Sequence, residues 1–434
     1  MSELNNNDNA RWGMTRRGFF AIGGGAVVAV AAGGAYMAGA APGDPPHRGK
    51  APAGLKTVGV PSNVKQMALA VTDGWVAMPL GLPPIDPYFP DTLAPAPFDT
   101  YVFGFRDMTG LNGAPSLPRE VVQAQQSKAQ ISAPFIECTV GEELWVTLSN
   151  LGLANRPDLV DSHTMHWHGF RNAIPFYDGV PESSVSVPIG RDFTYVFRPL
   201  DAGTYMYHCH FEDVEHVTMG MTGIVFVRPA GHPKWAYDAV DTAFDREYAI
   251  LLTEFDLSGH WNDAHIQTSD WTNFKPHVWL MNGRAYPDTL EPNGTRNNTT
   301  GDLDVPAAEH LQYQPNSSKI VAAPGEKVLI RIANLGFQEQ TLSMPGVALR
   351  TVGNDARYLN ADRQTISDTL VLGPGESRDV IIEAPAEVGV YPFFNTDPTK
   401  YRGTAADQWV GGQRTELEVR ATVAPQTAAN HWAQ

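Results

Sequence analysis

Short segments in which hydrophobic and polar residues alternate make up most of the chain, and turn-forming residues separate them. The segment PFIECTVGEELWVTLSN (residues 134–150) is typical of this pattern. Alternation with a period of two predicts β-strands that bury one face. Long stretches with the helical period are scarce, and 40 Gly and 34 Pro residues interrupt the chain. We therefore expect an all-β protein built from sandwiches of sheets.

Two pairs of segments show an internal repeat. VGEELWVTLSNLG (140–152) aligns without gaps with PGEKVLIRIANLG (324–336), and IGRDFTYVFRPLDAGTYMYHCH (189–210) matches PGESRDVIIEAPAEVGVYPFFNT (374–396). This repeat predicts two homologous β-sandwich domains in tandem. The expected divisions of the mature chain are a linker at 41–65, the first domain at 66–235, the second domain at 236–424 and a tail at 425–434.

Composition narrows the range of partners. The chain has 434 residues, of which 43% are hydrophobic and 18% charged, enough for two domains with their own cores. Its formal net charge of −16 argues against nucleic acid and against an anionic membrane surface as partners.

The N-terminal segment has the pattern of a targeting signal. A polar run leads into Thr15-Arg16-Arg17-Gly18-Phe19-Phe20, and a Gly/Ala/Val-rich stretch follows up to Ala40. This pattern predicts a twin-arginine export signal at residues 1–40, with cleavage after Ala40. The mature protein is then periplasmic or extracellular. If the signal is not cleaved, the same stretch would serve as a membrane anchor.

Candidate chemistry is concentrated in two segments. Residues 208–221 read HCHFEDVEHVTMGM and residues 163–169 read HTMHWHG, so that six of the 13 His residues lie between His163 and His216. Two His, one Cys and a weak axial Met form the ligand set of blue copper sites. Copper is therefore the cofactor that these residue types predict.

Strand geometry divides these side chains into two groups. Successive side chains of a strand point to opposite faces, so His208 and His210 share one face and Cys209 points to the other. The same parity separates His163 from His166 and His168. We therefore expect two metal sites back to back, joined covalently through residues 208–210. The first set is His163, Cys209, His216 and Met221, and the second is His166, His168, His208 and His210.

The second cysteine has a simpler interpretation. Cys138 lies in the alternating segment 134–150, where a small buried residue is the usual occupant. Because a copper ligand at position 209 cannot form a disulfide, we expect Cys138 to be a free thiol in the core.

The pairing of HxxHxHG with HCH and a following His and Met resembles the multicopper oxidases, the laccase-like enzymes. Residue types, order and most spacings agree, and the resemblance is strongest to two-domain members with type 1 copper in the first domain. It implies two cupredoxin-like Greek-key domains. It also implies that His163, Cys209, His216 and Met221 hold a type 1 copper that accepts electrons from a small-molecule or metal-ion donor. The histidines 166, 168, 208 and 210 would form half of a type 2/type 3 copper cluster that reduces dioxygen.

The second copy of the repeat departs from this family pattern. Counting from the shared Gly, residues 208–210 correspond to Phe394, Asn395 and Thr396, and the segment FQEQTLSMPG (337–346) has no His. In two-domain members a homotrimer builds the cluster between neighbouring subunits, with four His from each side. We therefore expect a homotrimer with a copper-free second domain and an incomplete cluster. The alternatives are a blue-copper electron-transfer or copper-binding protein, and a nitrite-reductase-like copper enzyme.

Overall fold

The computed structural model describes residues 64–426, apart from 114–116, 172, 305–307 and 402–410. The expected export signal at 1–40 and nearly all of the expected linker lie outside the described residues. The described residues belong to one compact unit. Within the described part of the chain, no helix has both the length and the hydrophobicity needed to cross a membrane.

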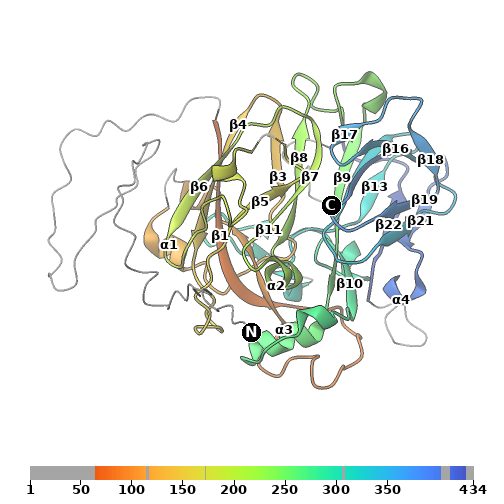
Figure 1. Ribbon diagram of the computed structural model, residues 1–434. Helices are drawn as coiled ribbons and strands as arrows, with labels where there is room; N and C mark the ends of the chain where they lie inside the picture. Colours follow the sequence, from red (N-terminus) through yellow and green to blue (C-terminus); the bar gives the residue numbers. More distant parts are fainter. Residues whose placement is uncertain (1–63, 114–116, 172, 305–307, 402–410, 427–434) are drawn as a thin grey trace, which may run out of the picture. The chain divides into compact units, whose positions relative to one another are not determined.

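The first half of the described chain forms two four-stranded sheets, as Figure 1 shows for the strands coloured from orange to green. The first sheet has the order β2 (Thr100–Asp107), β1 (Val64–Val76), β4 (Glu143–Asn150), β6 (Asp192–Phe197). The second has the order β3 (Ile136–Thr139), β8 (Thr222–Arg228), β7 (Gly203–His208), β5 (His166–His168).

The second half forms two larger sheets and a small hairpin. One sheet has the order β10 (Val278–Met281), β9 (Arg246–Phe255), β14 (Lys327–Asn334), β20 (Ser377–Glu383), β16 (Leu349–Asn354), β17 (Arg357–Tyr358), and β18 (Thr365–Ser367) also pairs with β16. The other has the order β13 (Ile320–Ala322), β22 (Arg414–Val419), β21 (Gly389–Asn395), β15 (Gln340–Ser343), β19 (Thr369–Leu372). The hairpin pairs β11 (Thr295–Arg296) with β12 (Leu303–Asp304).

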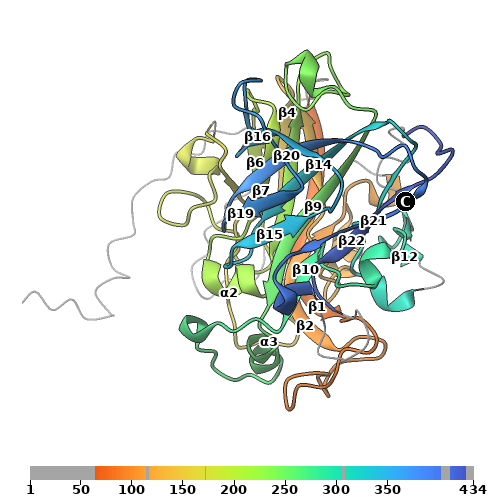
Figure 2. The same cartoon turned by 90° about the vertical axis from the view of Figure 1, so that its right-hand side faces the viewer.

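The α-helices in the described residues are few and short. Two of them, α2 and α3, lie near each other below the sheets in the views of Figures 1 and 2. The helices are α1 (Arg119–Gln123), α2 (Asp213–Thr218), α3 (Leu257–Ala264) and α4 (Pro398–Tyr401).

Corresponding strands pair in the same way in the two halves, which explains the sequence repeat. β1 runs parallel to β4 as β9 runs parallel to β14, and β3 runs parallel to β8 as β13 runs parallel to β22. The corresponding strands β7 and β21 begin at equivalent glycines of the repeat, Gly203 and Gly389. The shared strands therefore repeat one framework, to which the second half adds further strands.

The two halves pack closely against each other. Figure 2 shows β7 beside β14 and β20. Met206 and Ile224 pack there against hydrophobic residues of β9 and β14. Arg228 of β8 forms an ion pair with Glu247 of β9 across the same boundary, and both side chains are buried. The Arg331 guanidinium of β14 donates to the Thr204 hydroxyl of β7 at 3.2 Å. Because hydrophobic and charged groups are both paired across this boundary, the second domain gives the first a rigid support.

Candidate metal centre

The end of β7 and the start of β8 bring the Cys-containing segment together. β7 ends at His208, so Cys209 and His210, which the parity argument placed on the strand, follow it. The Cys209 N–H donates to the Met221 carbonyl at 3.3 Å. The chain turns at Glu212, which has a φ of 46°, and enters α2, where His216 is buried. A short helix therefore returns the second histidine to the cysteine.

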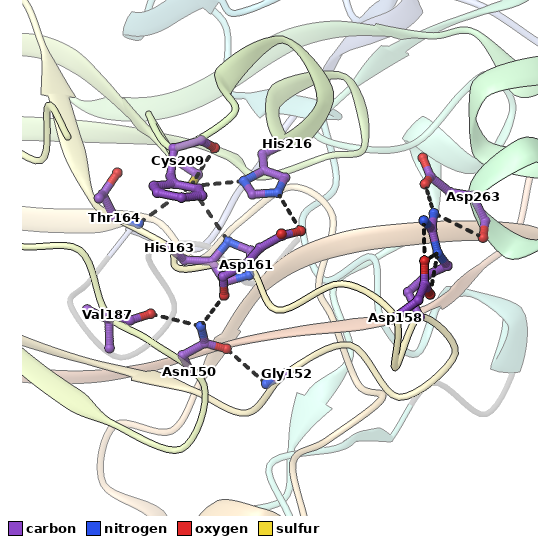
Figure 3. A network of polar contacts seen from close by, with 12 residues as sticks. Asn150, Gly152, Asp158, Asp161, His163, Thr164, Val187, Cys209, His216 and Asp263 are labelled. Atoms are coloured by element: carbon purple, nitrogen blue, oxygen red, sulfur yellow. Dashed lines mark hydrogen bonds and ion pairs between the residues drawn. The ribbon is translucent and has the colours of Figure 1, made fainter. Parts of the chain in front are cut away.

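The structure places Cys209, His163 and His216 in one buried group, seen in Figure 3. The Cys209 Sγ lies 3.3 Å from the His216 Nδ1 and 3.7 Å from the His163 Nδ1. The Thr164 N–H donates to the same sulfur at 3.5 Å. All three ligand candidates are fully buried, as is Met221 in the same core cluster. Three of the four predicted ligands therefore converge at one point, and Met221 lies in the same buried core cluster.

Asn150, at the end of β4, shapes the loop that carries His163. Its side-chain amide donates to the carbonyls of Asp161 and Val187 at 2.9 and 2.8 Å. Val187 in turn forms an isolated antiparallel bridge with His163. Asn150 belongs to the Asn-Leu-Gly sequence that ends both aligned repeat segments, at residues 152 and 336, and it positions the loop that carries His163.

The electrostatics of this group suit a metal cation. Burial, with a smaller effect from the neighbouring His216, lowers the pKa of His163 well below its usual value. Burial would also lower the pKa of His216, but Cys209 and Asp161 raise it to about 10. Metal binding requires deprotonated ligands and releases protons. Two imidazole nitrogens facing a sulfur form the donor set that copper prefers, so the residues present fit a type 1 copper.

A carboxylate stands behind His216 on the side away from the sulfur. The Asp161 Oδ2 lies 3.6 Å from the His216 Nε2, an ion-pair distance, and Figure 3 shows this arrangement. Glu212 joins these two residues in a group whose ligand atoms lie within 4.8 Å of one another. Asp161 is mostly buried and Glu212 is exposed, so the group leads from His216 towards the surface.

The second predicted ligand set gathers on the other face of β5 and β7. His166 pairs with His208 in the antiparallel register of the two strands. The ligand atoms of His166, His168 and His208 lie within 4.8 Å of one another. Trp167, between the two histidines of β5, stacks on Phe197 in the core at a centroid distance of 4.1 Å. Burial of this indole on one face holds the two imidazoles on the opposite face.

Backbone carbonyls orient two of these imidazoles. The His166 Nδ1 lies 2.7 Å from the Asp178 carbonyl, and the His208 Nδ1 lies 2.8 Å from the Cys209 carbonyl. Such contacts fix the ring and leave Nε2 for a metal. Burial lowers the pKa of His166 and His168, and it lowers that of His208 to about 3. These imidazoles are therefore neutral at pH 7, the form that binds metal.

His210 lies next to this group. Its ring is 5.1 Å from that of His166 and 5.5 Å from that of His208, centroid to centroid. The two sets of candidate ligands are joined through the peptide bonds of residues 208–210, as the strand parity predicts.

Comparison with known families identifies the chain. One model described as multicopper oxidase matches residues 116–232, and a second with the same description matches residues 260–416. Together they cover more than half of the chain. The chain belongs to the multicopper oxidase family. Membership implies copper as the cofactor, in agreement with the cofactor predicted from the residues.

Similar proteins support this placement. "Putative laccase-9" of Oryza sativa subsp. japonica is 28% identical over 267 residues, which are 60% of this chain and 39% of the laccase. The chain spans less than half the length of the curated relatives it matches.

Solved structures show the fold. The blue copper oxidase from Nitrosomonas europaea has a TM-score of 0.57 and 22% identity, over 82% of this chain and 86% of that chain. A copper nitrite reductase from the same organism has a TM-score of 0.52 and 15% identity, over 84% of this chain and 96% of that chain. The predicted all-β fold with cupredoxin-like domains is confirmed.

The second domain of this multicopper oxidase family member fills the equivalent pocket with amides. Ser343 pairs with Phe394 as His166 pairs with His208, so Gln340 is the counterpart of His163. The Asn395 N–H donates to the Gln413 carbonyl as that of Cys209 does to Met221. Three ligand positions of the first domain are thus replaced by Gln340, Asn395 and Gln413.

These amides saturate one another. The Asn395 Nδ2 donates to the Oε1 atoms of Gln340 and Gln413, at 2.8 Å in each case. The Gln340 Nε2 donates to the Glu254 Oε2 at 3.2 Å, and the three amide side chains are fully buried. A metal is not needed to hold this pocket together.

The sequence indicated the ligand candidates that the structure brings together, but not the residues that support them. Asp161, Asp178 and Thr164 act through contacts between distant segments. Cys138 is buried and is not in a disulfide, and burial raises the pKa of its thiol to about 12.

Proposed function

We propose that this protein is a copper-dependent oxidoreductase of the laccase-like type. It oxidises a small reducing substrate at a type 1 copper held by His163, Cys209, His216 and Met221. The observation that supports this proposal most directly is the buried group in which two Nδ1 atoms face the Cys209 sulfur. Copper supplies a one-electron redox couple there, and the protein excludes water and fixes the ligands.

Electrons then leave through the residues that join the two centres. His208 and His210 flank Cys209 in the chain, and His208 lies in the second group with His166 and His168. We infer that dioxygen is the electron acceptor at this second copper-binding group. The path from sulfur to imidazole follows covalent bonds of adjacent residues and does not cross solvent.

The test uses purified protein loaded with copper. We expect the intense visible absorption of a copper–thiolate bond and oxygen uptake with a phenolic donor. Cys209→Ser should lose both properties, whereas Cys138→Ser, which removes the other buried thiol, should keep both. Absence of the blue band in the parent, or its survival in Cys209→Ser, would falsify the assignment.

The donor should deliver its electron beside His216. Asp161 lies 3.6 Å from the Nε2 of this imidazole, and the exposed Glu212 belongs to the same group. Carboxylates at this position favour donors that carry a cation or an acidic hydroxyl group. Asp161→Asn should raise the KM for such a donor and leave the blue band in place. An unchanged KM for both phenolic and metal-ion donors would exclude this entry point.

We also propose export by the twin-arginine route and assembly as a homotrimer. The export proposal rests on Arg16 and Arg17 before a small-residue stretch, and the trimer on the family resemblance. Replacing both arginines by lysine should retain the protein in the cytoplasm. Light scattering of the mature protein should give the mass of three chains; the mass of a single chain would contradict the trimer.

A further inference from the structure

We propose that the second centre binds a single copper ion, held by His166, His168 and His208 of one chain, in place of a three-copper cluster. The inference rests on the proposed function, since it concerns the site that receives electrons from the type 1 copper. It differs from the family pattern because the residues present do not fit the full cluster.

The first argument is the number of available histidines. The sequence contains only two His-x-His pairs, at 166–168 and 208–210, and both belong to the first domain. The second domain of a neighbouring chain, which completes the cluster in two-domain family members, therefore brings no such pair. The cluster of the family needs such pairs from both sides, so this chain supplies half of the set.

The isolated histidines of the described second domain are engaged elsewhere. The buried His260 contacts the Tyr101 carbonyl through Nδ1 at 2.6 Å. Three others face carboxylates at distances of 3.0–3.4 Å: His265 with Asp91, His277 with Asp256, and His310 with Asp288. None of these histidines appears in the metal-ligating groups of the described residues.

The second argument is that three imidazoles already converge. Their ligand atoms lie within 4.8 Å of one another. Bonds of about 2.0–2.1 Å from imidazole nitrogen to a metal of similar size bring the ligands of one ion closer than this, so small side-chain movements suffice. The carbonyls of Asp178 and Cys209 already orient two of the rings. Imidazole ligands suit copper.

The third argument is that the chain's own second domain covers one side of the group. A Cβ atom added at Gly375 would lie 3.0 Å from the His168 Nε2. Gly375 has a φ of 75°, a conformation that other residues rarely adopt. The backbone of the second domain thus lies beside the His168 imidazole and brings no ligating side chain at this position.

The role of His210 distinguishes a one-ion site from a larger cluster. Its ring stacks on that of His208 with an interplanar angle of 27°, and it is not a member of the three-residue group. In a three-copper cluster, both histidines of each pair would be ligands. In the site proposed here, His210 lies beside the ion and is dispensable for binding.

The test is the copper content of the mature protein and of single variants, measured by mass spectrometry, with integrated paramagnetic resonance. The parent should hold about two copper ions per chain, all paramagnetic when oxidised. Cys209→Ser should hold one copper ion per chain and should show no blue absorption. His208→Ala and His166→Ala should each hold only the blue copper, and the blue band shows that these variants are folded.

His210→Ala should retain both copper ions, as should the control His232→Ala, whose ring stacks on Trp235 away from both groups. About four copper ions per chain, or a coupled pair without a resonance signal, would overturn the inference. It would also be overturned if His210→Ala lost as much copper as His208→Ala, or if the parent held only the blue ion. If the parent protein shows no blue band, the proposed type 1 site is wrong instead. Failure of the proposed function can therefore be distinguished from failure of the single-copper inference.

Discussion

At the end of β7, the first domain buries a thiol and two imidazoles that face one another, whereas at the end of β21 the second domain buries three amides. The backbone pairing at both places is the same. The Cys209 N–H donates to the Met221 carbonyl, and the Asn395 N–H donates to the Gln413 carbonyl. An amide carries both a donor and an acceptor, so a cluster of amides can satisfy itself. The thiol sulfur and the imidazole nitrogens are donor atoms that copper binds well.

The difference shows how one framework gives a metal centre or a structural pocket. Buried polar groups need partners, and the two domains meet this requirement with different chemistry. In the second domain, Asn395 provides the donor for two acceptors and Glu254 accepts from Gln340. The supporting asparagines, Asn150 and Asn334, are the same in both copies. The domains therefore differ at the ligand positions, whereas this supporting asparagine is present in both.

The largest expected effect comes from exchanging the central residue of each pocket for serine. Cys209→Ser should abolish the blue absorption, because the thiolate bond to copper produces it. Asn395→Ser, the matched change in the second domain, should leave the absorption unchanged. Spectra of the two copper-loaded variants at equal concentration provide the measurement. A blue band that depended on Asn395 would show that copper occupies the second pocket.

The next effect is on stability. Asn395→Leu leaves the Oε1 atoms of Gln340 and Gln413 without this donor in a fully buried pocket. An unsatisfied buried polar group costs about 1–3 kcal/mol, so the free energy of unfolding should fall by roughly 4 kcal/mol. Denaturant titration measures this loss, with the exposed Asn360→Leu as the control. Equal stability of both variants would mean that the amide cluster contributes little.

The contrast between the two pockets was only partly predictable from the sequence. Alternation and the repeat predicted the strands, and strand parity predicted which histidines share a face. The absence of His in FQEQTLSMPG predicted a different second pocket. The roles of Gln340 and Gln413 were missed, because they depend on the register of β15 and β22 against β21. Asp161 was missed because it reaches His216 from a loop distant in the sequence.

A smaller effect is expected in the pH dependence of the free energy of unfolding, to which Glu254 of the second pocket contributes. Burial raises the pKa of Glu254 to about 7, although hydrogen bonds from Phe337 and Gln338 oppose this. The folded state therefore holds a proton that the unfolded state loses near its ordinary pKa of 4.5. The stabilisation is complete below pH 4.5 and is lost as the pH rises through 7. It amounts to about 3 kcal/mol.

Glu254→Gln removes this group from the titration. Unfolding free energies of parent and variant between pH 4.5 and 8 should therefore converge or cross, with the parent showing the steeper decline. The difference in slope is the measurement, because a constant offset reports only the changed hydrogen bonds. Parallel curves would show that Glu254 ionises normally in the folded protein.

The smallest expected effect comes from replacing one residue of the first pocket by its counterpart in the second. Met221→Gln gives the first domain the residue that Gln413 provides in the second. Since Cys209 and both histidines remain, copper and its blue colour should be retained. The reduction potential should fall, because an amide oxygen is a harder ligand than a thioether and favours the oxidised ion. Met219, also fully buried, is the control, and Met219→Leu conserves volume and should leave the potential unchanged. If Met219→Leu shifts the potential and Met221→Gln does not, the axial ligand is Met219. Met221 and Gln413 would then be equivalent only in their backbone hydrogen bonds.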